Sequence, residues 1–501
     1  MSDMSATVAE TPKGFHVEGY EKIEYDFTFL DYVFDVKKDD LAKCYERWGR
    51  VLAVMDANIF EQYGEDLQQY CDHYKLDLSI HKTMIGEKAK SIDTFLSIVD
   101  SMTKFGIYRK EPVLVIGGGL VTDVAGFACA AYRRNTNFIR IPTTVIGLID
   151  ASVSIKVGVN YGNYKNRLGA YHAPIHTFLD FTFLRSLPTA QIRNGFAELI
   201  KISSCAHLPT FDLLDKYCEE IIKTGFGRTD DATAEVKEAC DKINRAGIHE
   251  MLKLETPNLH EIGLDRVIAY GHTWSPLHEL VPKVPLRHGH AISIDMAFSA
   301  TLAHQRGNLP QADYERLLKL FSRCGLSMDH PDFNEEILAQ ATAAILKTRD
   351  GKLRAAVPSP LGSCEFFNDV TEKEMNDALR KHKEVCKTYP RNGEGLEAFV
   401  DASDTGYTKN KAPVEKKLSN GLKKLNVLND DVSNGTNGFS PEKAEGLANG
   451  ALNGSTKSIN GNGNGHANGN GHANGNGHAN GNGHANGNGN GHANGDHGDC
   501  C

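Results

Sequence analysis

Four histidines lie in one short stretch of the chain, AYGHTWSPLHELVPKVPLRHGHA, residues 269–291: His272, His278, His288 and His290. Imidazole groups bind metal ions and transfer protons, so this density indicates a metal site, a proton-transfer site or merely histidine at the surface. His272 and His288 are sixteen residues apart with three prolines between them. They therefore lie on different segments that could converge, unlike a metal-binding pair on one helical turn.

A carboxylate that could complete such a site lies in RNGFAELIKIS, residues 193–203. Asn194, Glu198 and Lys201 are spaced i, i+4 and i+7, which places all three on one stripe of a helix. Two histidines and one carboxylate would leave zinc an open fourth position, as in catalytic zinc sites. A solvated face of salt bridges is the alternative, and the spacing by itself leaves both open.

A glycine-rich turn could bind a phosphate. The stretch PVLVIGGGLVTDVAGFACAAY, residues 112–132, predicts a strand, a turn at Gly117, Gly118 and Gly119, and a helix. Backbone N–H groups at such a helix start can approach a phosphate closely. The turn lacks the GxGxxG of dinucleotide folds and the GK[ST] of phosphate-binding loops, so a plain strand-to-helix turn is the alternative.

Residues 141–174, IPTTVIGLIDASVSIKVGVNYGNYKNRLGAYHAP, are dense in polar groups. Lysine and asparagine donate to hydroxyl and phosphate oxygens, and aspartate accepts hydroxyl protons, so the cluster suits a phosphorylated polyhydroxy ligand. An exposed polar loop is the alternative. The polar groups are Thr143, Thr144, Asp150, Lys156, Asn160, Lys165, Asn166, Arg167 and His172.

The elements that must position these groups change character along the chain. Residues 51–56, 112–119 and 137–144 predict buried strands, and 92–106 predicts an amphipathic helix between two of them. This alternation indicates an α/β fold with a parallel sheet and crossover helices. From Pro188 onward the patterns are mainly helical.

We expect four parts: a flexible N-terminus (1–19), an α/β domain (20–185), a helical domain (186–403) and a disordered tail (404–501). The tail has few large apolar residues and ends in a repeat of asparagine, glycine and histidine. Ordering it would cost backbone entropy with no apolar burial to offset that cost.

Composition narrows the classes of function. The chain has 501 residues, 40% of them hydrophobic and 24% charged, and a formal net charge of −9. An acidic balance without a basic patch argues against nucleic acid as a partner. No apolar run is long enough for a membrane span or a secretion signal, so we expect a cytoplasmic protein with reduced cysteines and no membrane partner.

Six motifs in order, GGGLVTDVAGF, IPTTVIGLIDASVSIK, YKNRLGAYHAP, NGFAELIK, GHTWSPLHE and LRHGHA, resemble the 3-dehydroquinate synthase-like sugar-phosphate cyclases over about residues 45–370. The resemblance implies a Rossmann-like NAD-binding domain, a C-terminal all-helical metal-binding domain and a cleft between them. It also implies a homodimer. Each subunit would bind NAD, one divalent metal ion (Zn²⁺ or Co²⁺) and a small sugar-phosphate substrate.

The resemblance also implies roles for single residues. The metal ligands would be Glu198, His272 and His288. The catalytic groups would be Lys156, Lys201, Asp150 and Asn166, and the substrate contacts Arg134, Lys165, Asn166 and Lys201. The NAD contacts would be Asp56, Glu87, Lys90, Gly118, Gly119, Asp123, Thr143, Thr144, Asp150, Lys156, Lys165 and Thr182.

Four departures from the dehydroquinate synthase pattern concern the substrate. Met251, Asp265, Ala269 and Pro276 align with a lysine, an arginine, an asparagine and a histidine of that pattern. Without those cationic and donor groups, a substrate carboxylate would be buried with no partner, which costs several kcal/mol.

The departures resemble the branch that cyclises sedoheptulose 7-phosphate, which contains 2-epi-5-epi-valiolone and desmethyl-4-deoxygadusol synthases. The motif wording is closest to the latter, which serve mycosporine and gadusol-type biosynthesis. That resemblance implies transient oxidation by NAD, phosphate elimination, reduction, aldol cyclisation and dehydration. The alternatives are a 2-epi-5-epi-valiolone synthase, a 3-dehydroquinate synthase, a zinc-dependent polyol dehydrogenase and an inactive scaffold.

Overall fold

The computed structural model describes residues 4–84, 86–162, 164–348, 350–391, 395–400 and 425–429. Most of the tail predicted to be disordered, 404–424 and 430–501, lies outside these residues. In the described part of the chain, no helix is both long and apolar enough to cross a membrane.

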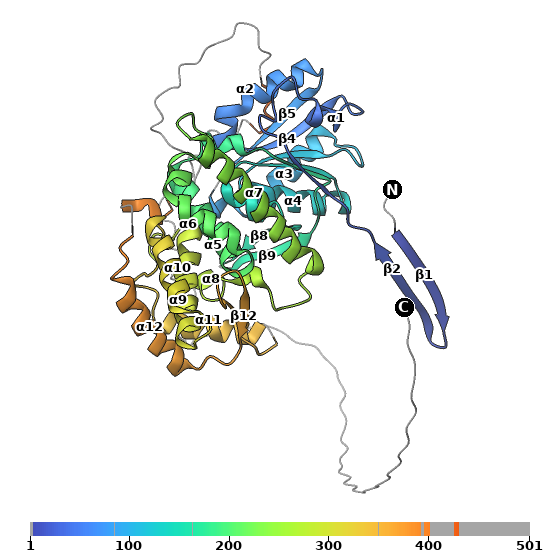
Figure 1. The fold of residues 1–501 in the computed structure, drawn as a ribbon. Coiled ribbons are helices and arrows are strands. Elements are labelled where there is room, and N and C mark those ends of the chain that lie inside the picture. Colours follow the sequence, from blue (N-terminus) through green and yellow to red (C-terminus); the bar gives the residue numbers. More distant parts are fainter. Residues whose placement is uncertain are drawn as a thin grey trace, which may run out of the picture. The chain divides into compact units, whose positions relative to one another are not determined.

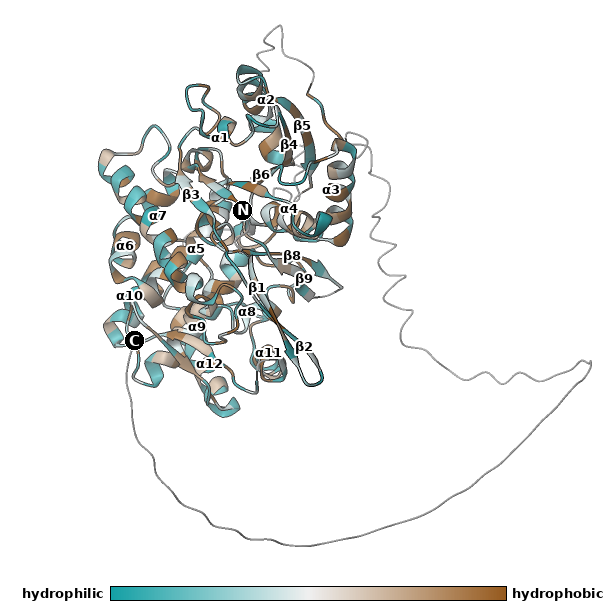
Figure 2. Cartoon of the chain, turned by 90° about the vertical axis from the view of Figure 1, so that its right-hand side faces the viewer, coloured by the Kyte–Doolittle hydropathy of each residue, from teal (hydrophilic) through white to brown (hydrophobic). Residues whose placement is uncertain are grey.

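A six-stranded parallel sheet forms the centre of the N-terminal half, in the order β3-β10-β7-β6-β4-β5. Figure 1 labels two of its strands, β4 and β5. Its central strands are mostly buried apolar residues, with the buried Arg140 of β7 as an exception, because helices cover both faces of a parallel sheet (Figure 2). The strands are β3 (Asp26–Phe29), β4 (Arg50–Asp56), β5 (Asp77–Thr83), β6 (Val113–Gly117), β7 (Phe138–Pro142) and β10 (His176–Leu179).

Alternate residues of β4 point into two separate cores. Val51 and Met55 of β4 pack with residues of α1 and α2, whereas Leu52 and Val54 pack with residues of α3 and α4. The three predicted strands and the predicted helix are thus confirmed. The helices of this half are α1 (Asp40–Lys43), α2 (Ala57–His73), α3 (Ile92–Phe105) and α4 (Gly119–Ala131).

The second half is helical, as expected, and has its own hydrophobic core. Helix α9 is buried along nearly its whole length because α5, α10 and α12 surround it. The helices are α5 (Thr189–Ala206), α6 (Leu208–Lys223), α7 (Ala234–Glu255), α8 (Ser275–His278), α9 (His288–Gln305), α10 (Gln311–Arg323), α11 (Glu335–Thr348) and α12 (Glu372–Cys386).

Three antiparallel hairpins were not predicted. β8 (Lys156–Tyr161) and β9 (Tyr164–Tyr171) lie within the polar stretch 141–174, and β11 (Ala355–Pro358) and β12 (Cys364–Phe367) lie within the helical half. The N-terminal segment, expected to be flexible, forms β1 (Met4–Thr11) and β2 (Gly14–Glu21), in which the described side chains are exposed.

Candidate metal and dinucleotide site

Glu198 is held in the interior by the packing of α5 against the segment that follows β7. A Cβ atom at Gly195 would lie only 2.3 Å from the Cβ of Val145, so glycine is needed for this close approach. Glu198 and Lys201 are 1% and 2% exposed and lie one helical turn apart on the same stripe. The alternative of a solvated salt-bridge face is therefore wrong.

His272 lies in the loop before α8, and its ring is held by the backbone. Its Nδ1 lies 3.2 Å from the carbonyl oxygen of Tyr270, so Nδ1 donates the hydrogen bond and the lone pair remains on Nε2. Burial, followed by the charge of Lys201, lowers the pKa of His272 to about 3. The ring is therefore neutral at physiological pH, the form that binds metals.

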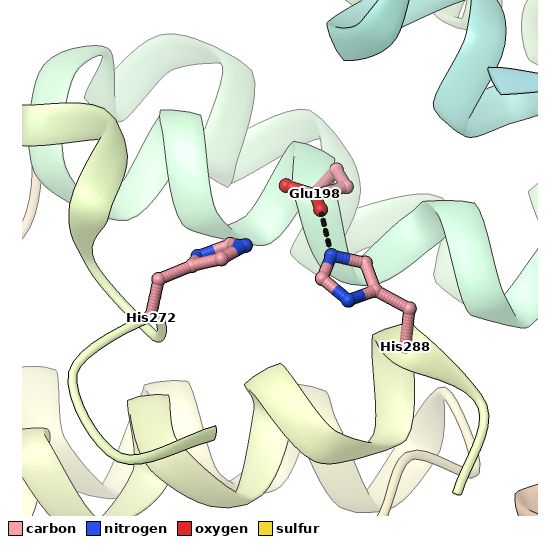
Figure 3. A group of neighbouring side chains, drawn as sticks. All are labelled: Glu198, His272 and His288. Atoms are coloured by element: carbon pink, nitrogen blue, oxygen red, sulfur yellow. Dashed lines mark hydrogen bonds and ion pairs between the residues drawn. The ribbon is translucent and has the colours of Figure 1, made fainter. Parts of the chain in front are cut away.

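His288 begins α9 and faces both Glu198 and His272 (Figure 3). Its Nε2 lies 2.9 Å from Glu198 Oε1, and its ring centroid lies 5.2 Å from that of His272. Burial by itself would lower the pKa of His288, but hydrogen bonds with Glu198 and Glu279 raise it to about 10. The predicted convergence of the two histidine segments is confirmed.

The start of α9 lies directly against the backbone of α5. A Cβ atom at Gly289 would lie 2.1 Å from the carbonyl oxygen of Asn194. The Gly289 N–H also donates to Asn194 Oδ1 at 2.6 Å. Asn194, the third member of the predicted stripe, therefore connects the helix of Glu198 to the helix of His288.

The donor set fits a divalent metal. One atom each from Glu198, His272 and His288 lie within 4.8 Å of one another, and this is the one such group in the part of the chain that the structure describes. One carboxylate and two imidazoles with an open position suit Zn²⁺ or Co²⁺. These residues remain the predicted ligands.

Lys201 connects the helical half to the sheet half. Its Nζ lies 2.5 Å from Glu198 Oε2 and 2.7 Å from Asp150 Oδ2. Asp150 belongs to a short π-helical turn, Gly147–Ala151, that follows β7. Burial raises the pKa of Asp150 to about 6, although the charge of Lys201 opposes this shift. Burial also acts to raise the pKa of Glu198, but Lys201 and His288 outweigh it and hold that pKa well below its usual range.

Glu279 is a site residue that the sequence analysis missed. Its Oε2 lies 3.2 Å from His288 Nδ1, and its Oε1 lies 2.6 Å from Lys165 Nζ. It is 6% exposed, and the charges of Lys165 and His288 outweigh burial and lower its pKa to about 2. Its position seven residues after His272, in GHTWSPLHE, was the available signal.

Several of the predicted NAD contacts lie at or just after the carboxyl ends of the sheet strands. Asp56 ends β4 and caps α2 by accepting the N–H groups of Asn58 and Ile59. Lys90 Nζ binds Asp123 Oδ2 at 2.6 Å, and Glu87 accepts from Asn160 at 2.7 Å. Parallel α/β sheets bind nucleotides at this edge.

The glycine turn approaches its neighbours too closely for larger side chains. A Cβ atom at Gly118 would lie 3.0 Å from Thr144, and one at Gly119 would lie 3.1 Å from Ala151. Thr143 is buried beside it. Thr182 instead binds Asp180 at the start of a short 3-10 helix, Phe181–Arg185, so its described contacts are local.

The predicted substrate residues are only partly brought together. Lys165 reaches Glu279, and through it His288. Asn166 is exposed in β9, and its N–H donates to Asn160 Oδ1. Arg134 is exposed in the turn after α4, with φ of 73°, and the described contacts do not place it at the metal residues.

Lys156 lines a cavity of about 210 Å³ whose wall also has the charged residues Glu255, Glu261, Asp265 and Arg266. Its Nζ lies 3.3 Å from Glu255 Oε1 and 3.1 Å from Glu261 Oε1. Burial lowers the pKa of Lys156, but these two carboxylates outweigh that effect and raise it, so the lysine stays charged. Asp265 also lines the cavity and pairs with Arg354.

Comparison with known proteins identifies the family. Residues 80–194 match the 3-dehydroquinate synthase N-terminal family and residues 195–348 match the 3-dehydroquinate synthase C-terminal family. The chain is also 54% identical over 399 residues, 80% of its own length and 97% of the relative's, to demethyl-4-deoxygadusol synthase of Trichormus variabilis. The chain belongs to the 3-dehydroquinate synthase family of sugar-phosphate cyclases.

Two further members of this family are similar over most of their length. The 2-epi-5-epi-valiolone synthase of an Actinoplanes species is 37% identical over 375 residues, 74% of this chain and 93% of that protein. A solved structure of the 2-epi-5-epi-valiolone synthase of Streptomyces hygroscopicus subsp. jinggangensis, with NAD⁺ and Zn²⁺ bound, is 34% identical. It has a TM-score of 0.69 and covers 74% of this chain and 99% of its own.

Proposed function

We propose that this protein converts sedoheptulose 7-phosphate to demethyl-4-deoxygadusol. The observation on which the proposal rests is the 54% identity to the Trichormus demethyl-4-deoxygadusol synthase over 97% of that enzyme's length. The same chain is 37% identical to a 2-epi-5-epi-valiolone synthase, which makes that activity the alternative.

The cavity beside Lys156 supports a substrate that has no carboxylate. Its wall has three carboxylates, of Glu255, Glu261 and Asp265, and two cations, Lys156 and Arg266. Among the positions that depart from the dehydroquinate synthase pattern, Met251 and Ala269 are buried and offer no donor side chain. Lys156 and Arg266 already pair with Glu261, so among the residues that line the cavity a heptulosonate carboxylate would find no unpaired cation, whereas the neutral end of sedoheptulose needs none.

The donor groups support binding of NAD and of one divalent metal. We propose that Glu198, His272 and His288 hold Zn²⁺ or Co²⁺. We also propose that the Asp56 carboxylate accepts hydrogen bonds from the hydroxyl groups of the nucleotide ribose. When bound, NAD supplies a reversible hydride acceptor and the metal supplies a Lewis acid, so NAD is recycled within the cycle.

The chain's own residues would orient the sugar phosphate and hold its charge. Ion pairs with Glu198 and Asp150 hold the ammonium group of Lys201 in one position. Lys156 and Lys165 are held by acidic partners in the same way, and they offer positive charge to phosphate and hydroxyl oxygens. Asn166 and Arg134 are further proposed substrate contacts.

The test is incubation of purified protein with sedoheptulose 7-phosphate, NAD and zinc, followed by the mass and ultraviolet spectrum of the product. We expect a product lighter than the valiolone by one water and no net NADH. A product with only phosphate lost would favour the valiolone alternative, and stoichiometric NADH would favour a polyol dehydrogenase. The homodimer and the cytoplasmic location stay predictions.

A further inference from the structure

Five residues of the tail, Leu425–Asn429, lie along the free edge of the central sheet. Val427 forms a parallel bridge with Ile80 of β5, the last strand in the sheet order (Figure 1). The segment follows the last residue of the family match by more than seventy positions. It departs from the predicted disorder of residues 404–501.

The backbone contacts are those that a seventh strand would make. The Ile80 N–H donates to the Asn426 carbonyl at 2.9 Å, and the Leu428 N–H donates to the Ile80 carbonyl at 2.8 Å. The other edge of β5 pairs with β4, so these are groups that β5 would otherwise leave open. Open strand edges recruit other strands, and proteins commonly cover them.

Asn429 adds a second pair of hydrogen bonds one step along β5. Its Oδ1 accepts from the Lys82 N–H at 3.0 Å, and its Nδ2 donates to the Lys82 carbonyl at 2.8 Å. Asn426 also donates to Ser79 Oγ at 3.0 Å. The side-chain amide of Asn429 thus pairs with the Lys82 backbone in the way that a backbone peptide group of a strand would.

The two leucines contact opposite faces of the sheet edge. Leu425 packs against the core cluster that contains α1 and α2 residues, and Leu428 packs against the cluster that contains α3 and α4 residues. Contacts on both faces, together with paired backbone groups, favour one register for the segment.

We propose that Leu425–Asn429 is a docking segment that closes the open edge of the nucleotide-binding sheet in the same chain and anchors the Asn/Gly/His tail there. Lys82, which Asn429 holds, directly precedes Thr83, and Thr83 is in register with Asp56. The next residues lead to Glu87 and Lys90. The segment therefore also steadies the strand that leads into the proposed NAD contacts.

Two truncated proteins, 1–433 and 1–423, test the proposal because they differ only in residues 424–433, which contain the segment. We expect the Ile80 and Lys82 amides to exchange hydrogen at least about tenfold faster in 1–423, because both lose their acceptors. We expect its melting temperature to fall by at least about 2 °C. Equal exchange and equal melting in the two proteins would overturn the proposal.

Point variants separate the segment's contacts from the truncation itself. Leu428→Asp in 1–433 should reproduce most of the faster exchange, because a carboxylate cannot pack in the apolar core cluster. The matched control is Leu96→Asp, a leucine on α3 that is 51% exposed, which should leave exchange in β5 unchanged. If Leu428→Asp and Leu96→Asp changed hydrogen exchange in β5 equally, a specific docking site for Leu428 would be contradicted.

A peptide spanning residues 424–430, KLNVLND, distinguishes pairing in the same chain from pairing between chains. Added to 1–423, it should slow the exchange of Ile80 and Lys82 again, as expected for strand addition. The dependence of the melting temperature on protein concentration should be the same for 1–433 and 1–423, whatever their oligomeric state. A steeper dependence in 1–433 alone would assign the segment to a second copy and overturn the proposal.

A third comparison is the dissociation constant of NAD, expected to be about two- to tenfold higher for 1–423 if the nucleotide loop loosens. This comparison rests on the proposed function. If neither protein binds NAD, the proposed function fails, whereas the exchange and melting results still decide the docking.

Discussion

Replacing Glu279 with glutamine should weaken metal binding without removing any predicted ligand. Glu279 accepts a hydrogen bond from His288 Nδ1 at 3.2 Å, while His288 Nε2 faces Glu198. A carboxylate at Nδ1 fixes the ring's tautomer and makes Nε2 a stronger donor to a metal. Glu279→Gln keeps the shape and one acceptor oxygen but removes the charge.

The size of the effect follows from that lost charge. A hydrogen bond to a charged group contributes about 1.5–3 kcal/mol, against about 0.5–1.5 kcal/mol for a neutral one. The difference is about 1–1.5 kcal/mol, or close to tenfold in the dissociation constant. Partners of this kind usually contribute about 10- to 100-fold in metal affinity, so we expect a loss of about tenfold or more.

The assay is competition for Zn²⁺ with a chromophoric chelator at neutral pH. The matched control is Glu250→Gln, because Glu250 is similarly buried, 7% exposed, and pairs with Lys253 at 2.8 Å rather than with a histidine of the site. A Glu279→Gln protein with zinc affinity within twofold of the parent would refute the reasoning. So would an equal loss in the Glu250→Gln control.

Three further predictions concern the ligands, the nucleotide and the substrate. His272→Ala and His288→Ala should each abolish stoichiometric zinc and turnover, measured by metal analysis and product formation; full metal content in either would reject the ligand assignment. Burial raises the pKa of Asp56 to about 6, against the backbone hydrogen bonds of Ile59 and Asn58, so it is ionised above that pH. Titration calorimetry should therefore show the dissociation constant of NAD rising as pH falls through 6 and constant above 7, and a flat profile from pH 5 to 8 would be inconsistent with a ribose contact. Sedoheptulose 7-phosphate should be preferred over the carboxylate-bearing heptulosonate phosphate by at least about a hundredfold in kcat/KM, and comparable turnover of both would exclude a role of the Lys156 cavity in that preference.

Strong local patterns made much of the fold predictable. The buried strands β4, β6 and β7 are mostly apolar, with Arg140 as the exception inside β7. Helix α3 has a serine cap before it and Gly106, with φ of 67°, after it. The stripe of Asn194, Glu198 and Lys201 was visible from helical spacing alone. Which residues the stripe would face was not, because that depends on the packing of α5 against α9.

The missed features depend on contacts between distant segments. Glu279 gains its role only because α8 brings it to Nδ1 of His288. Leu425 and Leu428 lie in a polar tail, where average composition hides a short apolar motif, and their partners on β5 are almost 350 positions away. Local sequence gives little indication of either arrangement.

The contact between Gly289 and the carbonyl of Asn194 bears on how a metal ion would enter and leave. The spacing of Glu198 and His288 is set by main-chain contact between two buried helices rather than by an ion. Loading would then require little reorganisation of the polypeptide, unlike small zinc domains whose folding and metal uptake are one event. The apoprotein would keep its shape, so different divalent ions could be exchanged without a cycle of unfolding, and availability in the cell would decide which one is carried.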